Sequence, residues 1–336
     1  MDPEAVAGGT RVPHGSSDDP DLLDFSANTN PLVPEGTERV YRGAFGAART
    51  YPPDGYPAYR QAAADYVDCD PGDVVPTPGG LAAIRLAVEV TADRGDSVLV
   101  PYPSFGEYAR EVRLQRADPS FVPHDELLDA DPADHALAVV CNPNNPTGDA
   151  YDAGRLRGFA DRCREAGTPL LVDEAFLGFT GERSLAGRDG VVVARSLTKL
   201  FGLPGIRAGF AVATGDLGTR LQVARRAWAL GTPAAAVGAH CMGCVAFVAE
   251  TRERVRAERE RMREALSGRF EVHPSDAPFL LLDVGGRDVA AVVERARERS
   301  VAVRDATTFR GLDSHVRVAV RLPDGNGRLL EVLADV

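Results

Sequence analysis

The feature that most constrains the fold is an alternation of short apolar segments with helical segments. Five apolar segments have the length and composition of buried strands, at 98–100, 137–141, 170–174, 191–195 and 208–213. Helical patterns lie around them, at 56–67, 80–94, 104–115, 151–166 and 216–230. Apolar strands that alternate with helices are typical of a mostly parallel sheet covered by helices on both faces. The sequence therefore predicts an α/β fold.

The two ends of the chain differ from this pattern. Residues 1–25 are rich in Gly, Pro, Asp and Ser, and we interpret them as an irregular N-terminal arm. A long helix rich in Arg and Glu is predicted over 234–267. It is followed by strands near 270–273, 279–284, 301–304 and 316–321, and by helices near 287–299 and 326–334. We therefore divide the chain into an arm (1–25), a large domain (26–233) whose first part is shared with the small domain, and a smaller α+β C-terminal domain (234–336).

The composition of the chain argues against nucleic acid, a membrane and a metal ion as binding partners. The chain has 336 residues and a formal net charge of -11, which argues against binding the nucleic-acid backbone. No apolar run reaches the ~18 residues of a membrane span, and no signal peptide is evident. We expect a cytoplasmic protein without membrane or nucleic-acid partners. Cys241 and Cys244 form a C-x-x-C pair, but no second pair follows, so we expect no metal site.

Lysine usage points to one position. Lys199 is the only Lys in the chain, and every other basic residue except His is Arg. A compositional bias explains the Arg residues but not the single retained Lys. Lys199 follows the predicted strand 191–195, and ligands of open α/β sheets bind at the carboxyl ends of the strands. Lys199 is therefore a candidate functional residue.

Other polar groups follow neighbouring strands. NPNNPTG (142–148) follows strand 137–141, Asp173 ends the apolar segment near 170–174, and Ser196 precedes Lys199. Arg207 lies eight residues after Lys199. We expect these groups to meet in one crevice.

The residue types in that crevice match pyridoxal 5'-phosphate (PLP). Lys199 offers an amine for the aldehyde, Asp173 an anion for the pyridine nitrogen and Asn145 a donor for the ring hydroxyl. Ser196 and Arg207 suit a phosphate. The turn formed by Gly79, Gly80 and Leu81 opens a predicted helix, whose free N–H groups can hold phosphate oxygens.

The whole set of motifs resembles fold-type I PLP enzymes of the class I/II aminotransferase family. The motifs run in family order: SANTNP (26–31), YPPDGY (51–56), the Gly79 turn, PYPSFGEY (101–108), NPNNPTG (142–148), VDEAF (172–176), SLTKLFGLPGIRAG (196–209) and HVRVAVR (315–321). The resemblance implies that Lys199 binds PLP and moves a proton, and that Phe105 stacks on the ring. It also implies that Tyr51 reaches the cofactor phosphate of a neighbouring subunit in a homodimer, and that Arg317 grips the substrate α-carboxylate.

Within the family, the chain is similar to threonine-phosphate decarboxylases and histidinol-phosphate aminotransferases. Four features favour the decarboxylase: DFSANTNP (24–31), Phe176 in DEAF where aminotransferases generally have Tyr, PSFGEY (103–108), and VRDATTFRGL (303–312) followed by HVRVAVR. Gly178 departs from the expected DEAF-x-D-F pattern, and PGGLA departs from the usual turn.

This resemblance implies decarboxylation of L-threonine O-3-phosphate to (R)-1-aminopropan-2-yl phosphate, for cobalamin biosynthesis. Candidate ligands of the phosphorylated substrate are Arg317, Arg304, Asn28 and His14. A histidinol-phosphate or other class I/II aminotransferase, or a catalytically silent PLP-fold protein, remains an alternative. His14 could equally belong to a free arm, and Phe105 or Tyr51 could be ordinary packing or surface residues.

Overall fold

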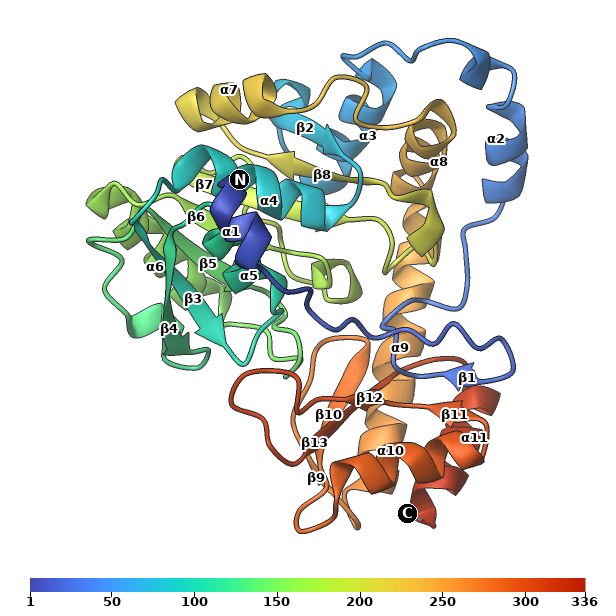
Figure 1. Ribbon diagram of the computed structural model, residues 1–336. Coiled ribbons are helices and arrows are strands. Elements are labelled where there is room, and N and C mark those ends of the chain that lie inside the picture. The colour runs from blue at the N-terminus through green and yellow to red at the C-terminus, as the bar shows by residue number, and fades with distance from the viewer. Residues whose placement is uncertain (336) are drawn as a thin grey trace.

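A seven-stranded sheet forms the centre of the larger part of the molecule (Figure 1). The computed structural model describes residues 1–335. The strands lie in the order β2 (Val74–Thr77), β8 (Gly209–Val212), β7 (Val191–Ser196), β6 (Leu170–Asp173), β5 (Leu137–Cys141), β3 (Ser97–Tyr102) and β4 (Asp118–Pro123). Strand β8 pairs antiparallel with β2 and β7, and the other neighbours pair in parallel. The mostly parallel sheet is confirmed.

Helices cover both faces of the sheet, and the central strands β5, β6 and β7 are buried at nearly every position. Successive side chains of a strand point to opposite faces, so Val139 packs into one apolar core and Val140 into the other. Ile84 and Val112 lie in the first core, on α4 (Gly80–Thr91) and α5 (Glu107–Leu114). The second core is covered by α3 (Pro57–Val67) and α6 (Ala153–Ala166). Helix α7 (Gly215–Ala224) packs beside α4, and α2 (Thr37–Gly43) beside α8 (Thr232–Met242).

The C-terminal part is a smaller α+β unit below the large sheet in Figure 1. Its antiparallel sheet has the order β12 (Arg304–Asp305), β13 (His315–Ala319), β10 (Phe279–Asp283) and β9 (Glu271–Val272). It is accompanied by α10 (Val289–Glu298) and α11 (Pro323–Ala334). Strand β1 (Leu23–Asp24) pairs in parallel with β11 (Val301–Ala302), so the end of the arm joins this unit.

The prediction of one continuous helix over 234–267 is wrong. The chain forms α8 (Thr232–Met242) and α9 (Val245–Leu266), which meet at a 72° bend. The break falls at Gly243, a weak helix former, and at Cys244, whose backbone is not helical. Helix α8 packs against α2 and α3 of the large domain, and α9 runs on into the C-terminal unit. The division at residue 233 stays a prediction.

Within residues 1–335, no single helix has the length and apolar character to cross a membrane. Helices α8 and α9 reach that length and composition only when they are counted together across their bend.

Two local expectations also need correction. The arm is not wholly irregular, because Pro3–Gly8 form helix α1, with Asp2 as N-cap accepting from Glu4 N–H and Ala5 N–H. Helix α7 ends at Ala224 and not near 230, since Asp54 binds the Arg225 guanidinium and the Trp228 N–H and holds that segment in a non-helical turn. Short 3₁₀ turns complete the chain: η1 (Ala47–Arg49), η2 (Pro71–Asp73), η3 (Leu127–Asp129), η4 (Leu177–Phe179) and η5 (Pro204–Ile206).

Candidate active site

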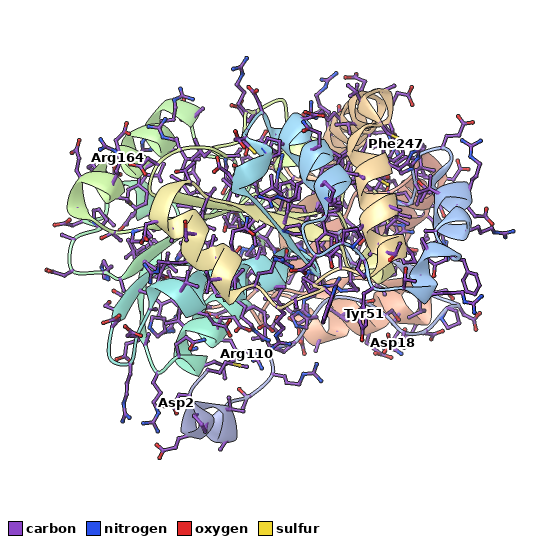
Figure 2. The ribbon with its side chains drawn as sticks, turned by 90° about the horizontal axis from the view of Figure 1, so that it is seen from above. Asp2, Asp18, Tyr51, Arg110, Arg164 and Phe247 are labelled. Atoms are coloured by element: carbon purple, nitrogen blue, oxygen red, sulfur yellow. The ribbon has the colours of Figure 1, made fainter. Side chains whose placement is uncertain are left out.

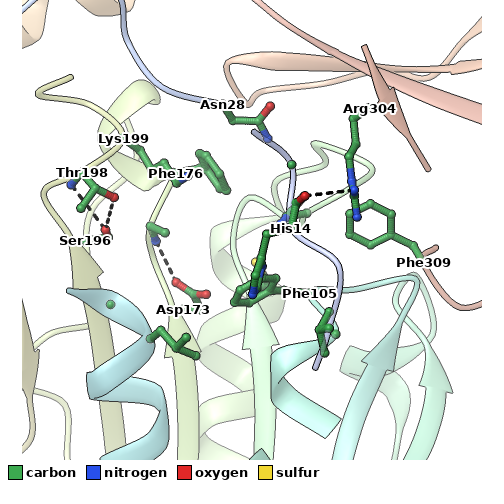
Figure 3. Close-up of a pocket in the computed structure, with 18 of the residues that line it drawn as sticks. His14, Asn28, Phe105, Asp173, Phe176, Ser196, Thr198, Lys199, Arg304 and Phe309 are labelled. Atoms are coloured by element: carbon green, nitrogen blue, oxygen red, sulfur yellow. Dashed lines mark hydrogen bonds between the residues drawn. The ribbon is translucent and has the colours of Figure 1, made fainter. Parts of the chain in front are cut away.

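A cavity of about 380 Å³ lies at the carboxyl edge of the sheet (Figure 3). Parallel pairing sets Cys141, Asp173 and Ala194 side by side at the ends of β5, β6 and β7, so the loops after them meet. The cavity brings together almost all the site residues expected from the sequence: His14, Asn28, Gly80, Leu81, Phe105, Asn145, Asp173, Ser196, Lys199, Arg207, Arg304 and Arg317.

One end of the cavity is a cradle for a phosphate. The pairing of β2, β8 and β7 aligns Thr77, Gly209 and Ser196, which places the start of α4 beside Ser196. The Ser196 and Thr198 hydroxyls lie 2.7 Å apart there. Arg207 reaches the same place, since a Cβ on Gly79 would lie 2.7 Å from its guanidinium. The free N–H groups of the first turn of α4, two hydroxyls and a guanidinium therefore converge on one anion-sized space.

Gly79→Ala tests this cradle. Gly79 has φ +95° and ψ 168°, a conformation essentially restricted to Gly. We expect the variant to lose about 1–3 kcal/mol of unfolding free energy and to bind PLP more weakly, because the new methyl group displaces Arg207. Thermal unfolding and a PLP titration measure both effects.

Gly158→Ala is the matched control, since Gly158 lies in α6 with no atom within 4 Å of a new Cβ. Equal PLP affinity in the two variants would count against the cradle.

Lys199 lies deep in the cavity, across from Asp173 (Figure 3). Within residues 1–335, its amine has neither a hydrogen bond nor an ion pair. Burial, and then the positive charges of Arg317 and Arg207, lower the pKa of Lys199 to about 8, while Asp173 opposes them. A substantial fraction of the amine is therefore neutral and nucleophilic near neutral pH.

We expect the cofactor-free protein to show this pKa in its reactivity. Reaction of Lys199 with a small aldehyde should rise with pH and reach half its maximal rate at about pH 8. Peptide-resolved mass spectrometry separates Lys199 from the α-amino group of Met1. A midpoint near the ~10.4 of an ordinary lysine would contradict the burial argument.

Asp173 is buried at the end of β6 and has two donors for its carboxylate. The Tyr108 hydroxyl donates to Oδ2 at 2.6 Å, and the Ala175 N–H donates to Oδ1 at 3.0 Å. Burial raises the pKa of Asp173, whereas these hydrogen bonds and the charges of Lys199 and Arg195 lower it.

Arg317 and Asn145 are in contact and both line the cavity. Arg317 is 5% exposed, and its guanidinium donates to Asn145 Oδ1 and to the Ser26 carbonyl at 3.1 Å. Its Nε has no partner among the described residues, and burial lowers the pKa of Arg317 to about 9. A buried cation with an unused donor suits an anionic ligand.

The N-terminal arm closes one side of the cavity. The Arg304 guanidinium donates to the carbonyls of Pro13 at 3.0 Å and His14 at 3.3 Å, and so ties the arm to the C-terminal unit. His14 Nε2 lies 3.2 Å from Glu107 Oε1, and its ring lies 5.9 Å from that of Phe105. Asn28 is buried, and its Oδ1 has no partner in the described part of the chain.

Two predicted site residues do not line the cavity: Gly79 adjoins the lining residues Gly80 and Arg207, whereas Tyr51 lies away from the cavity. The Tyr51 side chain, labelled in Figure 2, is 77% exposed. It stacks on Trp228 with ring centroids 4.4 Å apart. Tyr51 therefore does not contribute to the cavity of its own chain.

Two residues of the site were not singled out from the sequence. Thr198 belongs to the SLTK motif, and its hydroxyl bonds Ser196. Tyr108 closes the PYPSFGEY motif three residues after Phe105, and this helical spacing was the available signal. Contact with Asp173, 65 positions away, is a tertiary relation that no local pattern reveals.

The cavity as a whole fits PLP. It joins a cradle that a Cβ at Gly79 would fill, an amine without a partner among residues 1–335 and a buried carboxylate on the opposite side. No group of three or more His, Cys, Asp or Glu within the described chain could hold a metal ion.

Comparison with known proteins identifies the family. Residues 20–335 match the model for aminotransferase class I and II. The chain is 29% identical to histidinol-phosphate aminotransferase 1 of Archaeoglobus fulgidus, covering 94% of this chain and 99% of the relative. It is 30% identical to the threonine-phosphate decarboxylase of Salmonella typhimurium, covering 94% and 91%. The crystal structure of L-threonine-O-3-phosphate decarboxylase from Porphyromonas gingivalis has a TM-score of 0.85 at 26% identity, covering 93% and 98%. The chain belongs to the class I and II aminotransferase family and is a PLP-dependent enzyme.

Proposed function

We propose that this enzyme decarboxylates L-threonine O-3-phosphate to (R)-1-aminopropan-2-yl phosphate. The observation that carries the proposal is the set of cationic groups around Lys199. Arg317 and Arg304 line the same cavity, with His14 beside them. An amino acid with an α-carboxylate and a phosphate offers one anion to the buried Arg317, whose Nε has no partner among the described residues, and a second anion to Arg304 in the same lining.

Phe176 supports decarboxylation over amino transfer, because aminotransferases of the family generally have a Tyr at this position. It follows the Asp173 loop, lines the cavity and packs edge-on against Phe279 at 5.1 Å. A Tyr here could donate to the ring oxygen of the cofactor, and Phe cannot. The threonine-phosphate decarboxylase from Salmonella typhimurium, at 30% identity, supports the same reading.

The residues of the chain would share the work of holding the cofactor. Gly80 N–H, Ser196, Thr198 and Arg207 would hold its phosphate, Asp173 its ring nitrogen and Asn145 its ring oxygen. Phe105 would stack on its ring. When bound, PLP supplies an aldehyde for the substrate amine and a protonated ring that accepts electron density from Cα.

The bond that breaks is set by how the substrate is held. Arg317 and the arm would hold the substrate carboxylate so that the Cα–carboxylate bond, and not the Cα–H bond, is the one that breaks. The electron pair of that bond would stay with Cα when CO₂ leaves, and Cα would then take up one proton. Lys199, with its pKa lowered to about 8, can carry that proton at neutral pH.

A direct assay tests the reaction. We expect purified holoenzyme with L-threonine O-3-phosphate to release CO₂ and an aminopropanol phosphate in equal amounts, without any 2-oxo acid. Exchange of an amino group between histidinol phosphate and 2-oxoglutarate, with no CO₂, would assign the enzyme to the aminotransferases. The 29% identical relative in Archaeoglobus fulgidus bears that name. A coloured protein that turns over neither substrate would support a silent binding protein.

We further propose a two-fold homodimer in which Tyr51 of one protomer completes the site of the other. The exposed stack of Tyr51 and Trp228 supports this arrangement, since such a pair is normally covered. Co-expression of Tyr51→Phe and Lys199→Ala chains tests it. A shared site gives mixed dimers one intact centre and about half of the wild-type activity per dimer, whereas a site within one chain gives no gain over Tyr51→Phe.

A further inference from the structure

Tyr108 is a fully buried polar residue to which the reaction gives no role. It lies in the first turn of α5, behind Phe105, with the two rings perpendicular and 5.6 Å apart. Phe105 lines the cavity and Tyr108 does not. The Tyr108 hydroxyl lies 2.6 Å from Asp173 Oδ2, and Asp173 lines the cavity.

The direction of this hydrogen bond is fixed by chemistry. A carboxylate only accepts, so the Tyr108 hydroxyl donates. The Ala175 N–H donates to the other carboxylate oxygen. Asp173 is therefore clamped from two sides by donors, with its remaining acceptor capacity directed to the cavity.

We propose that Tyr108 is a positioning residue that keeps a proton on the cofactor's ring nitrogen by weakening Asp173 as a base. The inference rests on the pairing of Asp173 with the ring nitrogen proposed above. The carboxylate and the ring nitrogen share one proton, and the stronger base keeps it. Each donor to the carboxylate stabilises its anion and makes it the weaker competitor.

The surroundings make such a donor necessary. Burial alone raises the pKa of Asp173, which favours transfer of the shared proton to the carboxylate. A neutral ring then withdraws fewer electrons from Cα. Lys199 and Arg195 oppose the burial effect through space, but Tyr108 is the only side chain in the described structure that hydrogen-bonds Asp173.

The first test is Tyr108→Phe, which removes the hydroxyl and keeps the ring. We expect the ¹⁵N NMR signal of ring-labelled PLP in the variant holoenzyme to move from the protonated toward the unprotonated position. We expect kcat to fall about tenfold to a hundredfold, the fold-change equivalent to a charge-assisted hydrogen bond, with less change in KM.

Tyr151→Phe is the matched control. Tyr151 is partly buried, and its hydroxyl donates to the His124 carbonyl at 2.6 Å, outside the cavity lining. We expect this variant to lose stability but to keep the wild-type ¹⁵N signal. An unchanged ¹⁵N signal in Tyr108→Phe, with kcat within twofold of the control, would overturn the proposal.

A double-mutant cycle keeps the proposal testable if Tyr108→Phe lowers stability. If Tyr108 acts through Asp173, adding Tyr108→Phe to Asp173→Asn should change PLP affinity and kcat less than twofold. A full tenfold further loss would show that Tyr108 acts by another route and would overturn the proposal. A separate result would show that Asp173 does not pair with the ring nitrogen at all: Asp173→Asn alone would then leave the ¹⁵N signal unchanged. This result can be told apart from a failure of the Tyr108 proposal, in which Asp173→Asn shifts the signal and Tyr108→Phe does not.

Discussion

Lys199→Ala should abolish turnover, by at least about a thousandfold, and remove the covalently held cofactor. The variant loses both the amine that captures the aldehyde and the group placed to carry a proton to Cα. The chain has no other Lys, so no second side-chain amine can replace it. Borohydride reduction followed by mass spectrometry measures the result, since only the wild-type protein should gain the mass of reduced PLP.

Arg155→Ala is a suitable control for handling and labelling. Arg155 is 56% exposed and pairs with Asp129 on the surface, so its removal should leave activity and label unchanged. A Lys199→Ala protein that kept the label would place the cofactor elsewhere.

Asp173→Asn should lower kcat by about a hundredfold or more while leaving the fold intact. The amide has nearly the same shape but no negative charge, so it cannot hold a protonated pyridine nitrogen. Steady-state kinetics and the ¹⁵N signal of the ring measure the loss.

Glu174→Gln is the matched control, because Glu174 is the adjacent buried carboxyl and does not line the cavity. Its oxygens accept from Ser184 at 2.6 Å and the Leu185 N–H at 2.9 Å, and its partner cation is Arg195. We expect this control to unfold at a lower temperature with kcat retained. An equal loss of kcat in Asp173→Asn and Glu174→Gln would mean that the Asp173 charge has no specific role toward the cofactor and that any buried carboxylate at this strand end affects activity through stability.

The interior of the sheet could be predicted, and its edges could not. Strands β5, β6 and β7 each begin with a run of at least three apolar residues, the pattern of strands buried on both faces. The two edge strands, β2 and β4, were not predicted. They contain Pro76, Pro119 and Pro123, and a Pro within a short segment argues against a strand when only the local sequence is considered. An edge strand tolerates Pro because one side of its backbone has no partner strand.

Errors in the helices have tertiary causes. Helix α7 stops short of the expected length because Asp54, from a distant loop, binds Arg225 and the Trp228 N–H. The missed α1 has a local signal, Asp2 before Pro3, which the polar composition of the arm obscured.

The positions of polar residues after strand ends, and the order of the motifs, predicted that Lys199, Asp173 and Arg207 lie close together. All three line one cavity in the structure. Contacts between distant segments were beyond the sequence. The bond from Tyr108 to Asp173 and the bonds from Arg304 to the arm depend on how elements pack, and no spacing encodes them.

The exposed ring pair on the outer face has a practical consequence. Trp228 is the only tryptophan, it is 50% exposed, and it lies against Tyr51. The tryptophan emission of the protein therefore comes from one known place, and a blue shift of this emission with rising protein concentration would report that a second molecule covers that face.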